Sequence, residues 1–227
     1  SHLDDHQWLK DYFEFPDRLR LHDLDNMRVF LPSGKSYHFD LDAFAGHRLH
    51  FDGFLCDKAI DAGAEIHTGE AMTNIQHQSK LNRDLLVTSD GRYSFDFLID
   101  ASGSLAHVSR LRHGDDERYR PKDQVPTVYA QVQGNVPETF DVFLGSVAPS
   151  GYAWIIPKGP DTANVGLGVR AGYLEGNLKQ HLTEFCASLG FEILSWGGGW
   201  IPMGGPVKTM VDGTTLAIGD AAGLVMP

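Results

Sequence analysis

Thr214-Thr-Leu-Ala-Ile-Gly-Asp-Ala-Ala-Gly-Leu-Val-Met-Pro227 is the most informative part of the chain, because a short apolar strand runs directly into a Gly-Asp pair. A buried strand over residues 216–218 that ends at Gly219 lets the backbone approach a ligand, and Asp220 then begins a small-residue helix. The helix N-terminus suits a phosphate, and the carboxylate suits the hydroxyls of a polyol. The alternative is that Asp220 only caps the helix.

Composition limits the classes of function. The 227 residues suffice for one large domain or two small ones. A net charge of −11 without a local Lys/Arg cluster argues against nucleic acid as a partner. Cys56 and Cys186 lack metal-type spacing and fit a reducing compartment, so we expect a cytoplasmic protein. No apolar run approaches the roughly 20 residues that span a bilayer, which leaves peripheral membrane association open.

The first hundred residues are predicted to contain both helices and strands. We expect a helix over 5–20, a hairpin turning at 32–35, a helix over 54–62 that ends at Gly63, and a strand at 65–67. Asp90-Gly91 between two β-rich runs predicts a hairpin with a type I′ turn. The second of these runs loses its alternation at 97–99, which predicts a fully buried strand before the turn Ala101-Ser-Gly103. Such a turn is another place where backbone can approach a cofactor.

The later part of the chain is predicted to be an antiparallel sheet with one helix. Strand-like runs follow each other with short turns at 127–133, 139–144, 152–157 and 163–169. Apolar residues at helical spacing predict a helix over 174–189 that packs on this sheet. The Gly/Pro-rich residues 195–206 are expected to cross over with little regular structure.

Two aromatic side chains share one face of the strand at 152–157. Alternation places Tyr152 and Trp154 together, while Pro157 ends the strand and Gly159 turns it. Two such aromatics on a sheet pack into a core or line a binding site.

The two distinctive segments together resemble the geranylgeranyl reductase family of FAD-dependent enzymes. Leu-Ala-Ile-Gly-Asp-Ala-Ala-Gly at 216–223 looks like the second FAD motif of flavoprotein monooxygenases and geranylgeranyl reductases. Tyr-x-Trp-x-x-Pro-Lys-Gly at 152–159, followed by Val-Gly-x-Gly at 165–168, is similar to the signature of the reductases. The looser resemblance covers most of residues 25–227.

The resemblance implies a set of FAD contacts. Asp220 would hold the ribityl chain, Arg48 would lie near the pyrophosphate or the flavin, and the Met72 backbone would lie near the adenine, at the end of a strand. The remaining implied cofactor residues are Gly103, Gly219, Ala222 and Gly223. Ser102 stands where many hydroxylases have Asp, and Ala-Ser-Gly is common in the reductase branch. We further expect Arg48 and Asp220 to converge on one crevice.

The resemblance also implies a substrate site and a reaction. Tyr152, Trp154, Pro157 and Gly159 would line an apolar cavity in front of the flavin. Reduced FAD would deliver a hydride to a C=C bond of an isoprenoid, with electrons from NAD(P)H or ferredoxin. No catalytic residue and no proton donor are identified. His47 and His50 lack the further ligands that a metal site needs, so no metal is expected.

The implied fold class is α/β (α+β): a Rossmann-like FAD-binding domain interleaved with an antiparallel-sheet substrate domain. Residues 1–40 and 112–210 would belong to the substrate domain, and residues 41–111 and 211–227 to the FAD domain. The Gly-x-Gly-x-x-Gly turn of such folds is missing from these residues, and in the resembling families it precedes the part that corresponds to residue 1. We therefore expect the chain by itself to retain no FAD.

Two other functions stay open at this point. A flavin-dependent aromatic monooxygenase or halogenase would share the cofactor motifs, although hydroxylation favours Ala-Asp-Gly where this chain has Ala-Ser-Gly. A non-redox module for an apolar ligand would share the β-rich region, but it has little reason to carry Gly219-Asp220 at the end of a strand.

Overall fold

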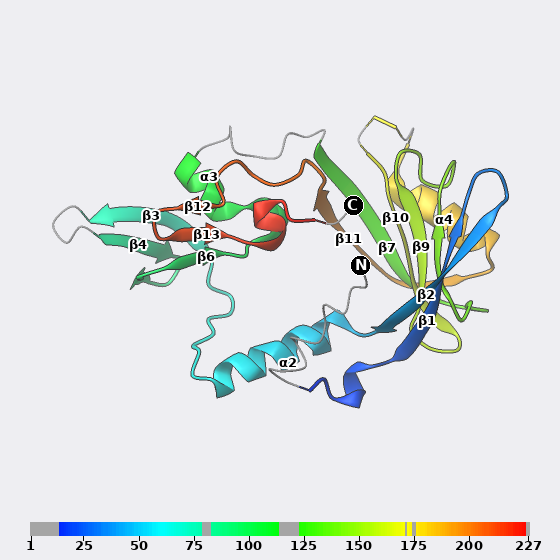
Figure 1. The fold of residues 1–227 in the computed structure, drawn as a ribbon, viewed down its shortest axis with the longest axis horizontal. Helices are drawn as coiled ribbons and strands as arrows, with labels where there is room; N and C mark the ends of the chain where they lie inside the picture. The colour runs from blue at the N-terminus through cyan, green and yellow to red at the C-terminus, as the bar shows by residue number, and fades with distance from the viewer. Residues whose placement is uncertain (1–13, 79–82, 114–122, 171, 174–175, 226–227) are drawn as a thin grey trace.

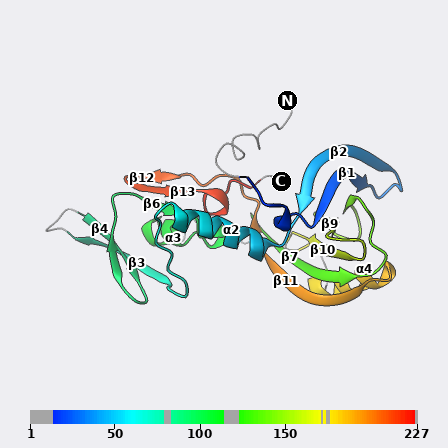
Figure 2. The same cartoon turned by 90° about the horizontal axis from the view of Figure 1, so that it is seen from below.

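The computed structural model describes residues 14–78, 83–113, 123–170, 172–173 and 176–225. Figure 1 shows two lobes: a large twisted sheet with one helix, and a smaller lobe built from two short sheets. α2 (Arg48–Asp61) extends from the large sheet along one side of the small lobe (Figure 1, Figure 2). Among the described residues, no helix is long and apolar enough to cross a membrane.

The large lobe is a seven-stranded sheet in the order β11-β7-β10-β9-β8-β1-β2. Neighbouring strands run antiparallel, except that β1 and β8 are parallel. The strands are β1 His22–Phe30, β2 Ser36–Ala45, β7 Gln124–Gln133, β8 Phe140–Phe143, β9 Tyr152–Pro157, β10 Thr162–Gly168 and β11 Glu192–Pro202. The predicted hairpin at 32–35 and the four predicted strands are confirmed.

One face of this sheet packs against α4 (Leu178–Ser188) and forms the core. The Asn177 side chain accepts a hydrogen bond from the Lys179 N–H and caps the helix. Leu182 and Cys186 are fully buried against alternate residues of the sheet, among them Ala153, Ile155, Val165 and Leu167. The helix begins later than predicted, at Leu178, and residues 174–175 lie outside the described residues.

A partly buried ion pair fixes the parallel junction between β1 and β8. The Arg28 guanidinium donates two hydrogen bonds, of 2.8 and 2.6 Å, to the buried Asp141 carboxylate. Thr139 Oγ1 donates a third, of 2.7 Å. Because the carboxylate is fully engaged, this bidentate pair ties residues 22–45 into the sheet that residues 124–202 form.

The small lobe contains two three-stranded sheets and a short helix. One sheet has the order β3-β4-β5, and the other has the order β12-β13-β6 with β13 and β6 parallel. Arg112 of α3 donates to Asp84 at 2.8 Å and to Asp212 at 3.2 Å, which joins the two sheets. The elements are β3 Met72–Gln78, β4 Arg83–Thr88, β5 Arg92–Ser94, β6 Leu98–Asp100, α3 His107–His113, β12 Val211–Asp212 and β13 Thr215–Ala217.

The structure corrects the expectation that residues 195–206 have little regular structure. Residues 192–202 form β11, which pairs with β7 along its length. The glycines are compatible with a strand here because a Cβ at Gly197 would lie 2.1 Å from Cζ of Tyr129. The strand therefore needs a residue without a side chain opposite that ring.

The turn at Asp90-Gly91 is also different from the prediction. The hairpin of β4 and β5 is confirmed, but neither Asp90 nor Gly91 has the positive φ of a type I′ turn. The Thr88 side chain shapes the turn instead, since its Oγ1 accepts a 2.9 Å hydrogen bond from the Gly91 N–H.

Several other element predictions were wrong in detail. The helix predicted over 54–62 begins already at Arg48, although Gly63 has the expected positive φ of 95°. Residues 65–67 form no strand, and Met72 begins a strand where we expected one to end. The strand near 97–99 is not fully buried, because Phe97 is 73% and Ile99 59% exposed. Most of the helix predicted over 5–20 lies outside the described residues, and its described part contains one 3₁₀ turn at Asp17–Leu19.

Candidate active site

The Gly-Asp segment forms a tight turn at the end of β13. A 3₁₀ helix, η5 (Gly219–Ala222), follows the strand, and both Gly219 and Gly223 have positive φ, of 55° and 71°. Ala221 and Ala222 are buried, whereas Asp220 is exposed. The glycines allow the sharp change of direction that presents Asp220 at the surface.

Asp100, which the sequence interpretation missed as a site residue, anchors the neighbouring turn. It is 2% exposed, and its carboxylate accepts hydrogen bonds from the Ser102 N–H at 3.0 Å and from Ser102 Oγ at 2.6 Å. Its second oxygen accepts from the N–H groups of Val108 and Ser109 at 3.2 and 3.3 Å. An Asp at a strand end with a Ser two positions later is the pattern of an Asx turn, which is the signal that identifies it.

These two turns lie side by side. β6 and β13 pair in parallel, and the Ile218 N–H donates a 3.0 Å hydrogen bond to the Asp100 carbonyl. η2 (Gly103–Leu105) contacts η5, so the structure brings Gly103 and Gly219 to the same end of the small sheet. A Cβ at either glycine would have no atom within 4 Å, so the backbone of both turns is open to a ligand.

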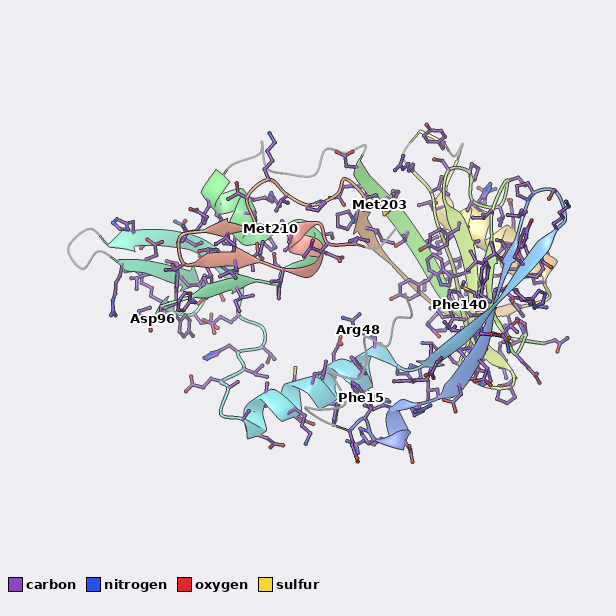
Figure 3. All side chains as sticks on the ribbon, viewed as in Figure 1. Phe15, Arg48, Asp96, Phe140, Met203 and Met210 are labelled. Atoms are coloured by element: carbon purple, nitrogen blue, oxygen red, sulfur yellow. The ribbon has the colours of Figure 1, made fainter. Side chains whose placement is uncertain are left out.

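The other two predicted cofactor residues lie on separate elements. Arg48 begins α2, is 86% exposed and pairs with Asp52 at 2.6 Å; Figure 3 shows its side chain on the side of α2 that faces the middle of the molecule. Met72 begins β3 and lines a hollow of about 400 Å³ together with His67, Glu70 and Tyr93. Hydrogen bonds from Thr88 and Tyr93 lower the pKa of Glu70. The convergence of Arg48 and Asp220 stays a prediction.

Tyr152 and Trp154 lie on the face of the large sheet opposite α4. Their neighbours in β9, Ala153 and Ile155, point into the core, whereas Tyr152 is 42% exposed and Trp154 partly so. The ring centroids are 5.9 Å apart, and the Trp154 indole N–H donates a 2.7 Å hydrogen bond to Asn164 Oδ1. Both rings are therefore held on the sheet without being packed against the helix.

Glycines on the neighbouring strands make room for the rings on this face. A Cβ at Gly166 would lie 2.3 Å from Cζ2 of Trp154, so the indole lies over the glycine. In the same way Tyr129, which is 38% exposed, lies over Gly197. We call the surface formed by Tyr129, Tyr152, Trp154, Gly166 and Gly197 the aromatic platform. Tyr129 could not be found from the sequence, because only the strand register shows which glycine it faces.

The ends of the predicted substrate segment have different surroundings. Pro157 is buried at the end of β9. Gly159 lines a polar hollow of about 530 Å³ whose other residues include His22, Asp23 and Glu138. Gly159 therefore borders a hollow that is lined by carboxylates. The apolar surface of this segment is the aromatic platform, to which Gly159 does not belong.

The described residues contain no group of three or more His, Cys, Asp or Glu side chains placed to hold a metal. The rings of His47 and His50 are 5.5 Å apart at the start of α2. Burial raises the pKa of Cys186 to about 11, which makes this thiol a poor nucleophile at neutral pH.

Comparison with known proteins matches the platform to a named domain. Residues 125–198, which contain every platform residue, match the family model described as the geranylgeranyl reductase catalytic domain. Digeranylgeranylglycerophospholipid reductase 2 of Methanothermobacter thermautotrophicus is 34% identical over 188 residues, which are 79% of this chain and 48% of the relative. The chain spans about half the length of the curated relatives it matches.

Solved structures share the fold. A geranylgeranyl bacteriochlorophyll reductase-like protein of Thermoplasma acidophilum has a TM-score of 0.80 at 21% identity, over 93% of this chain and 58% of that one. A flavin-dependent brominase has a TM-score of 0.70 at 18% identity, over 97% and 60%. The predicted mixed α/β fold class is confirmed.

Proposed function

Because the chain belongs to the geranylgeranyl reductase family, we propose that the complete protein is a flavin-dependent oxidoreductase that reduces C=C bonds of an isoprenoid lipid. The aromatic platform is the observation that supports this most. It offers apolar rings on a face of the sheet that α4 does not cover. An isoprenoid chain has few polar groups, so rings of this kind suit it better than a hydrogen-bonding pocket.

The platform residues position the chain. The rings of Tyr129 and Trp154 lie over Gly197 and Gly166 along the strands, and Tyr152 flanks Trp154. Contact with these rings removes apolar surface of the lipid from water, at about 25 cal/mol per Å² buried. The bond between the Trp154 indole and Asn164 holds the ring in one orientation and pairs the indole N–H, which would otherwise face the lipid unpaired.

We propose FAD as the cofactor, held by the turns of the small lobe. Gly103 and Gly219 have positive φ and open space where a side chain would be, so that a ligand can reach the backbone of both turns. Asp220 would accept hydrogen bonds from the ribityl hydroxyls, with Ala222 and Gly223 behind it. Arg48 would face the pyrophosphate, and the Met72 backbone would face the adenine. When bound and reduced, the flavin supplies the hydride.

The two lobes then have separate tasks. The predicted FAD-binding segments, residues 41–111 and 211–227, would hold the cofactor, although residues 41–45 form the end of β2 in the large sheet. The large sheet would hold the lipid. A soluble donor, NAD(P)H or ferredoxin, would supply electrons. The lipid substrate implies that the protein works at a membrane surface.

The function is tested on the complete protein. Flavin released by denaturation is identified by chromatography as FAD or FMN, and digeranylgeranylglycerol phosphate is incubated with the reduced protein. We expect FAD, and a product that has gained a pair of hydrogens at each reduced C=C bond by mass spectrometry. A protein that binds no flavin would refute the redox assignment. Hydroxylated or halogenated aromatic products with an unreduced lipid would favour a monooxygenase or halogenase.

Asp220→Ala is expected to weaken FAD binding by about 10- to 100-fold, because it removes a charge-assisted hydrogen bond to a ribityl hydroxyl. The dissociation constant is measured by flavin fluorescence on reconstitution of the complete apoprotein. Asp96→Ala, at an exposed carboxylate of the same lobe, is the matched control and should bind FAD normally. Equal affinities of the two variants would mean that Asp220 does not hold the cofactor.

A further inference from the structure

Lys158 continues the platform face of β9 beyond the end of the strand. Along β9, Tyr152, Trp154 and Ile156 alternate with the core residues Ala153 and Ile155. The ladder extends past Pro157, since the Lys158 N–H donates a 2.8 Å hydrogen bond to the Thr162 carbonyl. Strand alternation therefore places the Lys158 side chain on the same side of the sheet as the platform.

The Lys158 ammonium is half-buried, and no carboxylate neutralises it within the part of the chain that the structure describes. It takes part in none of the ion pairs there, and burial lowers its pKa. A partly desolvated cation without a partner is costly for the protein, so the position favours a ligand that brings negative charge. The chain has a net charge of −11, and yet this cation makes no ion pair among the described residues.

A basic group, His47, lies within electrostatic reach of Lys158. The pKa of His47 is lowered by its own burial, by Lys158 and by His50, so both of these groups lie within electrostatic reach of the imidazole. An imidazole is either neutral or positively charged, so His47 provides no counter-charge for Lys158. Arg48, the next residue, already pairs with Asp52. This end of the platform thus carries a half-buried cation that makes no ion pair among the described residues.

We propose that Lys158 binds a phosphate group, and that this phosphate belongs to the head group of an isoprenoid phospholipid whose chain lies on the aromatic platform. The inference rests on the proposed function and specifies which residue meets the head group, since one strand then supplies both the apolar contacts and the charge. An ammonium group is a compact donor that suits a phosphate oxygen. The other source of the same chemistry is the pyrophosphate of FAD.

The test uses the complete flavin-loaded protein and two lipids: digeranylgeranylglycerol phosphate and digeranylgeranylglycerol without the phosphate. Dissociation constants are measured by tryptophan fluorescence in the oxidised state, so that no turnover is required. Lys158→Gln should weaken binding of the phosphorylated lipid about 10- to 100-fold and leave the neutral lipid unchanged. Lys158→Arg keeps the charge and should retain most of the preference, and Lys35→Gln in the exposed β1–β2 turn should change neither value.

The outcomes separate the possibilities. If Lys158→Gln leaves the preference for the phosphorylated lipid intact but weakens FAD retention, the phosphate belongs to the cofactor and the lipid assignment is wrong. If neither the preference nor FAD retention changes, Lys158 binds no phosphate. Failure to reduce either lipid would contradict the proposed function alone, because the binding constants are obtained without catalysis.

Discussion

Replacing Asp100 by alanine is expected to lower the free energy of unfolding by about 3–5 kcal/mol, because one buried carboxylate then leaves several donors without an acceptor. The N–H groups of Val108 and Ser109 belong to buried residues and both point at Asp100. Ser102 loses its bonds as well, at 3.0 and 2.6 Å. The alanine side chain supplies no hydrogen-bond acceptor that could replace the carboxylate for these donors.

The measurement is urea denaturation of the complete protein, with graded variants. Ser102→Ala removes the bond of the hydroxyl to Asp100 and its 2.8 Å bond from the His107 N–H, and should cost about 1 kcal/mol. Asp57→Ala, at an exposed aspartate of α2, should cost less than about 0.5 kcal/mol. A loss of stability at Asp100→Ala no larger than at Asp57→Ala would mean that the turn does not depend on the carboxylate. Because the turn carries Gly103, FAD retention should fall with stability.

Local patterns in the sequence predicted most of the elements, because those elements depend on local spacing. Alternation located β7 to β10, and helical periodicity located α4, although it placed the start of the helix four residues too early. The wrong prediction for residues 195–206 has a physical cause. The glycines of β11 were interpreted as a crossing because a glycine run weakens a strand locally, and only the pairing with β7 shows that Tyr129 covers Gly197.

In the candidate site too, local motifs predicted some residues, whereas other residues depend on contacts between distant parts of the chain. Motifs singled out Asp220, Tyr152 and Trp154 as candidates, since the residues of each motif lie within a few positions of each other. The contributions of Tyr129 and Lys158 depend on strand register and on burial, which bring together residues far apart in the chain. The contact between η2 and η5, which unites Gly103 with Gly219, likewise follows from the parallel pairing of β6 with β13.

Gly166→Ala is expected to reduce kcat/KM for the isoprenoid lipid by about 100-fold, because a displacement of about 1 Å in a positioning group has effects of this size. Gly166 lies within β10, and its added Cβ would be 2.3 Å from Cζ2 of Trp154 and 2.8 Å from Cβ of Tyr129. Both rings must move, and displacing the indole breaks its 2.7 Å bond to Asn164. Overpacking of this kind also costs about 1–3 kcal/mol of stability.

Gly199→Ala is the matched control for this change, because it adds the same methyl group to the same face of the sheet, on β11. Its nearest atom would be Thr127 Oγ1 at 3.9 Å, which is ordinary van der Waals contact. Steady-state kinetics of the complete protein, with unfolding measured in parallel, should therefore show near-normal values for Gly199→Ala and a selective loss for Gly166→Ala. If the Gly166 variant folds and reduces the lipid as fast as the control, the rings over the glycines do not position the substrate, and the lipid must bind elsewhere on the sheet.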